Sequence, residues 1–309
     1  MNCFVKAKPL FIAGPTGVGK SAFALELALQ LDGEVLGADA FQIYQGLPVL
    51  TAQPSKKDQA QVPHHLIGVL PLTEVCDAAR YQAMAQPIID QIVARGRVSL
   101  ITGGTGFYFR SLISPLDPLP GADPELRAAF APLSLGELVM QLETMDPKIL
   151  PQLDLKNRRR VERALEIMMQ TGRPLSEIWH KKEQESVTGF LLIRDREELY
   201  ERITNNVREM FDRNVLEEVR ALGSIEFSQT AAMTLGLREI QACCRGEKTI
   251  QETINLITTA TKRYAKRQLT WFKNQHNFVV LNLSHFSSTR QAVKEAINLK
   301  TAMDCGKLT

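Results

Sequence analysis

Apolar residues in this chain occur in short runs separated by longer amphipathic stretches, a pattern typical of alternating strands and helices. The short apolar runs predict strands at 10–13, 33–39, 66–70, 98–102, 189–193 and 278–283. Apolar positions that recur every three to four residues predict helices at 22–28, 77–95, 124–131, 134–144, 156–171, 197–222, 249–274 and 287–302. The alternation predicts an α/β fold, with a parallel sheet flanked by helices.

Two proline-containing stretches interrupt this alternation. Residues 51–63 are polar and predict a loop. Prolines also crowd 115–124, and because only helical patterns follow, we read that segment as a linker into a helical insertion. The predicted division is a first core part at 1–122, a mostly helical insertion at 123–188, and a second core part with long helices at 189–309.

Composition narrows the class of protein. The chain has 309 residues, 44% of them hydrophobic and 23% charged, which suffices for one large or two smaller cores. Its five cysteines show no CxxC spacing, so they predict reduced residues of a cytoplasmic protein and not a zinc site. Lys6 and Lys8 interrupt the N-terminal signal-peptide candidate, and apolar runs stay below transmembrane length, so we expect no membrane association.

The residues 14–21 carry the most specific motif. They fit G-x-x-x-x-G-K-[ST] between a predicted strand and a predicted helix, which predicts a P-loop NTPase-like core. The glycines allow backbone N–H groups to surround an anion, Lys20 adds a positive charge, and the Ser21 hydroxyl can bind a metal ion. We expect a diphosphate or triphosphate to contact Gly14, Pro15, Thr16, Gly17, Val18, Gly19, Lys20 and Ser21.

Two further turns are predicted at the same edge of the sheet. Asp39 ends the second predicted strand, where it could hold Mg²⁺ through water, accept a proton, or act as an ordinary turn residue. The turn at 103–106, Gly-Gly-Thr-Gly, follows the strand at 98–102. By itself this sequence indicates no more than a tight turn, but beside a P-loop it is a candidate second wall of one site.

Positive charge is small overall but uneven. The formal net charge is only +3, yet cations gather at 156–163 and 262–267. A run of charges on a helix is usually a solvated face, and contact with phosphates is the alternative for 156–161, which holds four cations and no acid.

Taken in order, these motifs resemble the tRNA dimethylallyltransferase (tRNA isopentenyltransferase) family over essentially the whole chain. The matching segments are GPTGVGKS (14–21), D-x-x-Q-x-Y-x-G from Asp39, VPHHL (62–66), GGTGFYF (103–109), DPELR (123–127), RRRVERALE (158–166), LYERI (199–203), LGLREI (235–240) and YAKRQLTWF (264–272). The resemblance implies transfer of a dimethylallyl group from dimethylallyl diphosphate to the exocyclic amine of the adenosine 3′-adjacent to the tRNA anticodon.

The resemblance also assigns roles. The P-loop would hold the diphosphate with Mg²⁺ at Ser21, and Asp39 would accept the proton from the amine, with Thr105 facing it. The adenine would be flipped into a channel. The residues implied in tRNA binding are Asp39, Ala40, Phe41, Gln42 and Thr105 at the base, and Arg127, Arg159, Arg160, Val161, Glu162 and Arg163 at the RNA backbone.

Several positions depart from the family pattern. Pro48-Val49-Leu50-Thr51-Ala52-Gln53-Pro54 lacks the acid, glycine and lysine of D-I-G-T-A-K-P, and Asn214 stands where glycine is common. Three other activities remain open: prenyl transfer to free adenosine nucleotides, a P-loop small-molecule kinase, and non-enzymatic RNA binding. We expect a monomer.

Overall fold

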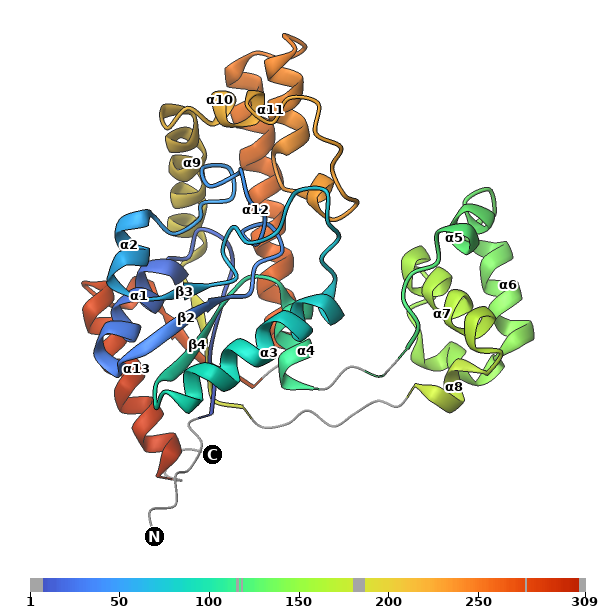
Figure 1. Cartoon of the computed structure of the whole chain (residues 1–309), viewed down its shortest axis with the longest axis horizontal. Coiled ribbons are helices and arrows are strands. Elements are labelled where there is room, and N and C mark those ends of the chain that lie inside the picture. The colour runs from blue at the N-terminus through green and yellow to red at the C-terminus, as the bar shows by residue number, and fades with distance from the viewer. Residues whose placement is uncertain (1–7, 115–116, 118, 180–186, 276, 306–309) are drawn as a thin grey trace. The chain divides into compact units, whose positions relative to one another are not determined.

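The computed structural model describes residues 8–114, 117, 119–179, 187–275 and 277–305. The chain forms two compact units: a core made of Met1–Ile113 and Glu185–Thr309, and a helical unit, Ser114–Gln184, inserted between the two parts of the core (Figure 1).

The core is built on a six-stranded parallel sheet in the order β3-β2-β4-β1-β5-β6. Its strands are β1 (Leu10–Ala13), β2 (Gly33–Gly37), β3 (His64–His65), β4 (Val98–Gly103), β5 (Gly189–Ile193) and β6 (Val279–Asn282). Parallel strands require crossover connections, and helices supply them. The core helices are α1 (Lys20–Leu31), α2 (Lys56–Gln61), α3 (Ala78–Ala94), α4 (Gly106–Ile113), α9 (Arg196–Asp212), α10 (Val215–Arg220), α11 (Leu237–Cys244), α12 (Ile250–Gln275) and α13 (Thr289–Asp304). The predicted α/β class is confirmed.

The two faces of the sheet bury alternate residues of its strands, as the period of a strand requires. Leu10 and Ile12 of β1 belong to the apolar cluster formed with α1 and α13. Phe11 and Ala13 belong to the cluster formed with α3 and α4, on the other face (Figure 1). Because both faces are covered, the strands read as continuous apolar runs, and this made them predictable.

The helical unit has its own core. Its elements are α5 (Pro124–Phe130), α6 (Leu135–Met145), the 3₁₀ helix η1 (Pro147–Gln152), α7 (Arg158–Thr171) and α8 (Leu175–Ile178). The buried residues Phe130, Leu138, Leu142, Ile149 and Leu165 pack together. The unit begins at Ser114, where the prediction had 123, and Leu119 already packs against its core.

Three expectations about elements were wrong. The segment 66–70 is not a strand, since Leu66 and Gly68 both have a φ of 58° and turn the chain after β3. The predicted loop at 51–63 contains α2, which Ser55 caps. The predicted helix 197–222 is two helices, α9 and α10. They meet at Asn214, whose φ of 61° is the left-handed conformation that glycine favours and asparagine tolerates.

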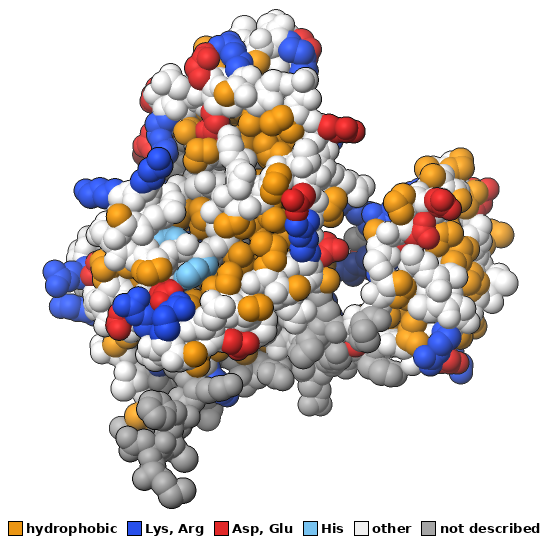
Figure 2. Space-filling model, viewed as in Figure 1, with side chains coloured by type: hydrophobic (Ala, Val, Ile, Leu, Met, Phe, Trp, Pro, Cys, Tyr) orange, Lys and Arg blue, Asp and Glu red, His pale blue; other side chains and the backbone are white. Residues whose placement is uncertain are grey.

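Figure 2 shows Lys and Arg side chains spread among acidic ones on this face of the molecule, in keeping with the small net charge. The edge strand β3 consists of His64 and His65, both of them partly buried. There His65 Nε2 lies 2.7 Å from the buried Glu34 Oε2, and Arg95 binds the same carboxylate. Across the described ranges, no group of three or more His, Cys, Asp or Glu could hold a metal ion, and no helix could span a membrane.

Candidate functional site

The P-loop connects β1 to α1 at the carboxyl edge of the sheet. Gly17 and Gly19 have φ values of 80° and 106°, which residues with a Cβ rarely adopt. Gly17 also has no room for a side chain, because its Cβ would lie 2.8 Å from Cγ1 of Ile203 on α9. The glycines that the motif specifies are therefore required both by backbone conformation and by packing.

Two arginines from the second part of the core hold this loop. The Arg202 Nε donates to the Gly17 carbonyl at 3.0 Å, and the Arg194 Nε donates to the Val18 carbonyl at 2.9 Å. The Nη2 atoms of both arginines lie within 3.9 Å of where a Cβ of Gly19 would be. The loop thus has two guanidinium groups beside it in addition to the lysine of its motif, and Arg202 lines the adjacent cavity.

Lys20 is the cation within the loop. Its Nζ donates to the Pro15 carbonyl at 2.9 Å. Burial among protein atoms lowers the pKa of Lys20 to about 8, and the nearby negative charge of Asp39 opposes this shift. The ammonium group is therefore poorly solvated in the free protein, and an anion placed next to it would be bound strongly.

Asp39 and Thr105 occupy neighbouring turns, as predicted. The Asp39 Oδ1 accepts hydrogen bonds from the backbone N–H groups of Phe41 at 3.0 Å and Gln42 at 3.4 Å. The Thr105 Oγ1 accepts from the Ala40 N–H at 2.8 Å, within the Asp39 turn. Across the described chain, no hydrogen bond occupies the Asp39 Oδ2, which leaves one carboxylate oxygen available to a ligand.

The second glycine-rich turn does form a wall of the same site. Gln268 of α12 joins the two turns: its Oε1 accepts from the Thr16 N–H at 2.8 Å, and its Nε2 donates to the Gly104 carbonyl at 2.9 Å. A Cβ on Gly104 would lie 2.1 Å from that Nε2. The glycine is thus needed because the amide approaches the backbone so closely.

A cavity of about 320 Å³ opens between these elements. One end is polar and is formed by the P-loop, Asp39 and Arg202. Apolar side chains also line the cavity, namely Val49, Leu50, Val207, Met210, Leu235 and Ile257, together with polar ones that include Asn206, Glu209 and Arg213. Phe41 and Tyr264 also line it, with ring centroids 6.0 Å apart. Burial, and next the Asp39 charge, raise the pKa of Tyr264, so its hydroxyl stays protonated at neutral pH. The cavity therefore combines an anion site with an apolar surface.

The segment 48–54 closes one side of the cavity even though it departs from the family pattern. Glu218 of α10 accepts hydrogen bonds from the backbone N–H groups of Val49 at 2.7 Å and Leu50 at 3.3 Å. Gln42 donates from Nε2 to the carbonyls of Thr51 and Ala52 at 3.1 and 3.0 Å. Gln42, predicted to meet the base, thus has its amide group turned towards this segment.

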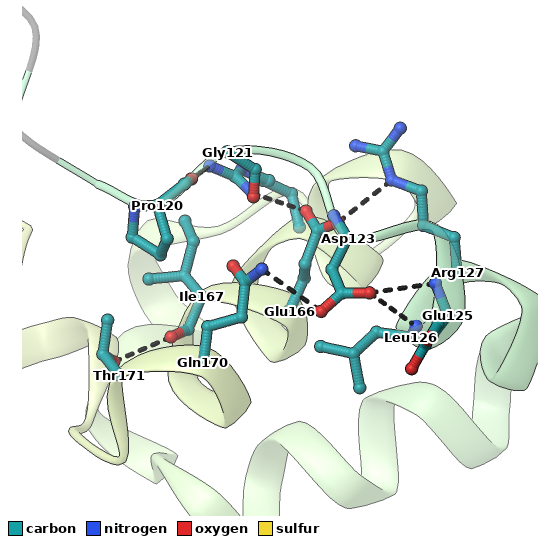
Figure 3. A network of polar contacts seen from close by, with 11 residues as sticks. Pro120, Gly121, Asp123, Glu125, Leu126, Arg127, Glu166, Ile167, Gln170 and Thr171 are labelled. Carbon is teal, nitrogen blue, oxygen red and sulfur yellow. Dashed lines mark hydrogen bonds and ion pairs between the residues drawn. The ribbon is translucent and has the colours of Figure 1, made fainter.

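In the helical unit, the predicted RNA-binding residues divide into two groups. Glu166 is 1% exposed and binds Arg127 at 3.1 Å, Arg163, and the Asp123 N–H at 2.6 Å (Figure 3). Arg163 also donates to the carbonyls of Pro120 and Gly121. Burial by itself would raise the pKa of Glu166, but these hydrogen bonds and charges hold it below its usual value. Arg127 and Arg163 thus serve the structure of the unit.

The other residues of that segment differ in exposure. The Val161 side chain is fully buried, and Glu162 pairs with Arg158 at 2.6 Å. Arg159 and Arg160 are exposed, and neither has a carboxylate partner within the described residues. Of the cations in this helix segment, Arg159 and Arg160 are therefore available to an external phosphate.

The site also uses residues to which the sequence assigned no role, namely Arg194, Arg202, Tyr264 and Gln268. Arg202 lies in LYERI and Tyr264 and Gln268 in YAKRQLTWF, so the matching segments contained them. Their positions against the P-loop depend on folding of the second part of the core, which no local pattern reveals.

Comparisons with known proteins agree with this geometry. The family model described as IPP transferase matches residues 42–275. The tRNA dimethylallyltransferase of Akkermansia muciniphila is 41% identical over 268 residues, which cover 86% of this chain and 90% of that protein. The corresponding protein of Caulobacter sp. is 38% identical and covers 87% and 90%.

Solved structures give the same result. The tRNA isopentenylpyrophosphate transferase of Bacillus halodurans matches with a TM-score of 0.72 and 31% identity over 97% of both chains. A eukaryotic dimethylallyltransferase acting on tRNA has the same fold, with a TM-score of 0.81 at 23% identity, covering 97% of this chain and 80% of that one. The chain belongs to the IPP transferase family.

Proposed function

We propose that this protein transfers a dimethylallyl group from dimethylallyl diphosphate to the exocyclic amine of the adenosine 3′-adjacent to the anticodon in tRNA, with release of diphosphate. The observation that carries the proposal is the single cavity in which a P-loop with a poorly solvated lysine faces a carboxylate and an apolar wall. The names of its relatives support the same reaction.

The polar end of the cavity fits the leaving group. In this transfer the allylic carbon–oxygen bond breaks, so negative charge grows on the departing diphosphate oxygen. The backbone N–H groups of the P-loop, Lys20 and Arg202 are the donors placed to stabilise that charge. Lys20 carries its positive charge at neutral pH, and the arriving anion favours that charged form further.

The apolar side fits the prenyl group. Val207, Met210 and Ile257 provide a surface on which five carbons can be buried, and Phe41 and Tyr264 add aromatic faces near the position where positive charge develops. A prenyl group that covers these side chains would keep water away from the allylic cation, which would otherwise react with it.

Asp39 fits the role of proton acceptor. The attacking amine loses a proton when the new carbon–nitrogen bond forms, and the Asp39 Oδ2 is the carboxylate oxygen that remains available. The two backbone hydrogen bonds on Oδ1 hold the carboxylate in one orientation. Thr105 supports this arrangement through the Ala40 N–H.

The residues present also fit a magnesium ion. The Ser21 hydroxyl lines the cavity next to the P-loop, which suits Mg²⁺ because this ion binds few protein ligands and takes the rest from phosphates and water. When bound there, the ion would neutralise charge on the diphosphate.

The RNA would be held by phosphate contacts at Arg159 and Arg160, which are exposed and lack carboxylate partners in the part of the chain described. The cysteines in that part, Cys76, Cys243, Cys244 and Cys305, are free. Free cysteines and a tRNA substrate support our expectation of a cytoplasmic protein, and we expect it to act as a monomer.

The test is a transfer assay with purified protein, dimethylallyl diphosphate, Mg²⁺ and unmodified tRNA, followed by mass spectrometry of the nucleosides. We expect one prenylated adenosine per tRNA at the position after the anticodon. Parallel reactions with AMP as acceptor, and with ATP in place of the prenyl donor, test the other two enzymatic activities. Prenylation of AMP but not of tRNA, or ATP-dependent phosphorylation of a small acceptor, would contradict the proposal.

A further inference from the structure

A large aromatic side chain is exposed directly beside the site. Phe107 lies in the first turn of α4, two residues after Thr105, and is 58% exposed. Arg110 is exposed three residues later on the same helix, so the two side chains share a face. One exposed apolar residue is ordinary on a protein surface, so the case for a ligand depends on what surrounds Phe107.

A second ring makes Phe107 part of a platform. Trp271 of α12 packs directly on Gly106, where a Cβ would lie 2.4 Å from its ring atoms. The centroids of Phe107 and Trp271 are 6.2 Å apart, with an interplanar angle of 49°. Trp271 is in turn edge-on to the buried Phe272, at 5.1 Å and 85°. The platform is therefore anchored to the core of the protein.

The same helix carries the aromatic wall of the cavity. Tyr264 precedes Trp271 by seven residues, or about 10.5 Å along α12. Arg267 lies between Tyr264 and Trp271 in the sequence. Its guanidinium carbon is 5.6 Å from the centroid of the Tyr264 ring. The rise of about 10.5 Å from Tyr264 to Trp271 is about three times the spacing of stacked bases, about 3.4 Å. The platform and the aromatic wall of the cavity therefore lie about two helical turns apart along α12, which offers positions for two separate bases.

The charges near the platform suit a polyanion. Arg110 and Arg267 are exposed, and in the described part of the chain neither has a carboxylate within ion-pair distance. Aromatic faces interleaved with unpaired arginines are the features with which proteins bind single-stranded nucleic acid. An apolar peptide or a membrane would not require the two guanidinium groups.

We propose that Phe107 and Trp271 form a stacking platform for an unpaired base that neighbours the target adenosine, with Arg110 and Arg267 at the flanking phosphates. The inference rests on the proposed function, because it takes an RNA loop as the substrate. Holding the neighbouring base on this platform would keep it apart from the target base, which must leave the stack to enter the cavity.

The test is a double-mutant cycle that combines substitutions in the protein with removal of a base from the RNA. Affinity is measured for the full chain and an RNA hairpin that carries the anticodon loop, with the base on either side of the target adenosine intact or removed as an abasic nucleotide. We expect Phe107→Ala to weaken binding of the intact hairpin by about 5- to 150-fold, the range for loss of one stacked base. With one of the abasic hairpins, the same substitution should have no further effect.

Two variants separate stacking from loss of apolar area or of structure. Phe107→Tyr keeps the aromatic face and should bind the hairpin as the wild type does, whereas Phe107→Leu keeps apolar volume and should bind as weakly as Phe107→Ala. Leu29→Ala, at an equally exposed position on α1, should change nothing. Equal effects of Phe107→Ala on intact and on both abasic hairpins would overturn the inference, as would normal binding by Phe107→Leu.

Failure of the platform proposal can be distinguished from failure of the proposed reaction. Prenyl transfer to tRNA by the wild type reports on the reaction, whereas the coupling between Phe107 and the neighbouring base reports on the platform. Transfer without coupling contradicts the platform alone, and coupling without transfer contradicts the reaction alone. A wild-type protein that does not bind the hairpin contradicts both.

Discussion

The phosphate loop of the core and the Glu166 network of the helical unit treat their positive side chains in opposite ways. In the helical unit, Arg127 and Arg163 are neutralised by the buried Glu166 and fix the entry of the chain into the unit. In the core, Lys20 and Arg202 bond to backbone carbonyls, and within the described residues neither has a carboxylate within ion-pair distance. Cations that hold a fold are compensated by the protein itself, whereas cations that await a ligand are left for the ligand to compensate.

The largest expected effect tests the carboxylate near these uncompensated cations. Asp39→Asn keeps the shape and the Oδ1 hydrogen bonds but cannot accept a proton, so we expect the single-turnover rate to fall by about 10²–10⁴-fold. RNA affinity should change much less. The measurement is the rate at saturating donor and tRNA across a series of Mg²⁺ concentrations. Recovery of the rate at high Mg²⁺ would assign Asp39 to metal binding instead.

Lys20→Ala tests the core cation itself. We expect a loss of about 10²–10³-fold in turnover, because one donor to the developing negative charge is removed, with RNA affinity unchanged. Single-turnover rates and filter binding measure the two quantities, and Lys294→Ala, an exposed lysine on α13, is the matched control. Equal loss of RNA affinity and turnover would count against separate sites for diphosphate and RNA.

The lowered pKa of Lys20 also predicts two pH effects of opposite sign. Donor affinity should fall as the pH rises through about 8, because the ammonium loses its proton. The stability of the ligand-free protein should instead rise between about 8 and 10.5, since the unfolded chain binds more protons there than the folded one. Calorimetric titration and thermal unfolding measure these effects, and Lys20→Arg should flatten both. If donor affinity and stability changed in the same direction with pH, the lowered pKa of Lys20 would be contradicted.

Glu166→Ala tests the compensated cations of the helical unit. Removing Glu166 should cost about 1–3 kcal/mol of the free energy of unfolding, because the Asp123 N–H and the partly exposed Arg127 and Arg163 lose their acceptor. Since the folded pKa of Glu166 is lowered, its contribution should be present above the unfolded value of 4.5 and lost as the pH falls below it. Denaturant unfolding of Glu166→Ala and of the exposed control Glu177→Ala measures the difference, and equal stabilities would contradict the prediction.

The smallest effect is expected at the exposed arginines. Replacing Arg159 and Arg160 together with Ala should reduce the slope of log K against log salt for RNA binding by about one to two. Stability should stay within about 0.5 kcal/mol, as for other surface changes. An unchanged salt slope would show that the two arginines do not contact phosphates and belong to an ordinary solvated helix face.

Features of the fold and the site could be predicted from the sequence when the residues that determine them are close together in the chain. The P-loop, the buried strands and α3, α7 and α12 were predictable because their signals lie within a few turns of chain. The break at Asn214 was missed because the apolar repeat continues across it, and only the backbone conformation separates α9 from α10. Asp39 and Thr105 were placed in one site because both follow parallel strands. Arg202 and Gln268 could not be placed, because their roles depend on contacts 185 and 252 residues away in the chain.

The bond between Gln268 and the P-loop has a consequence for synthesis of the protein. Residues 14–21 are synthesised about 250 residues before Gln268, whose amide ties Thr16 to Gly104. Because the ribosome makes the chain from its N-terminus, the loop is synthesised long before the residue whose hydrogen bonds complete it. We therefore expect ribosome-bound chains that stop before α12 to lack tight binding of diphosphate, so that a nascent chain does not sequester the donor before it can use it.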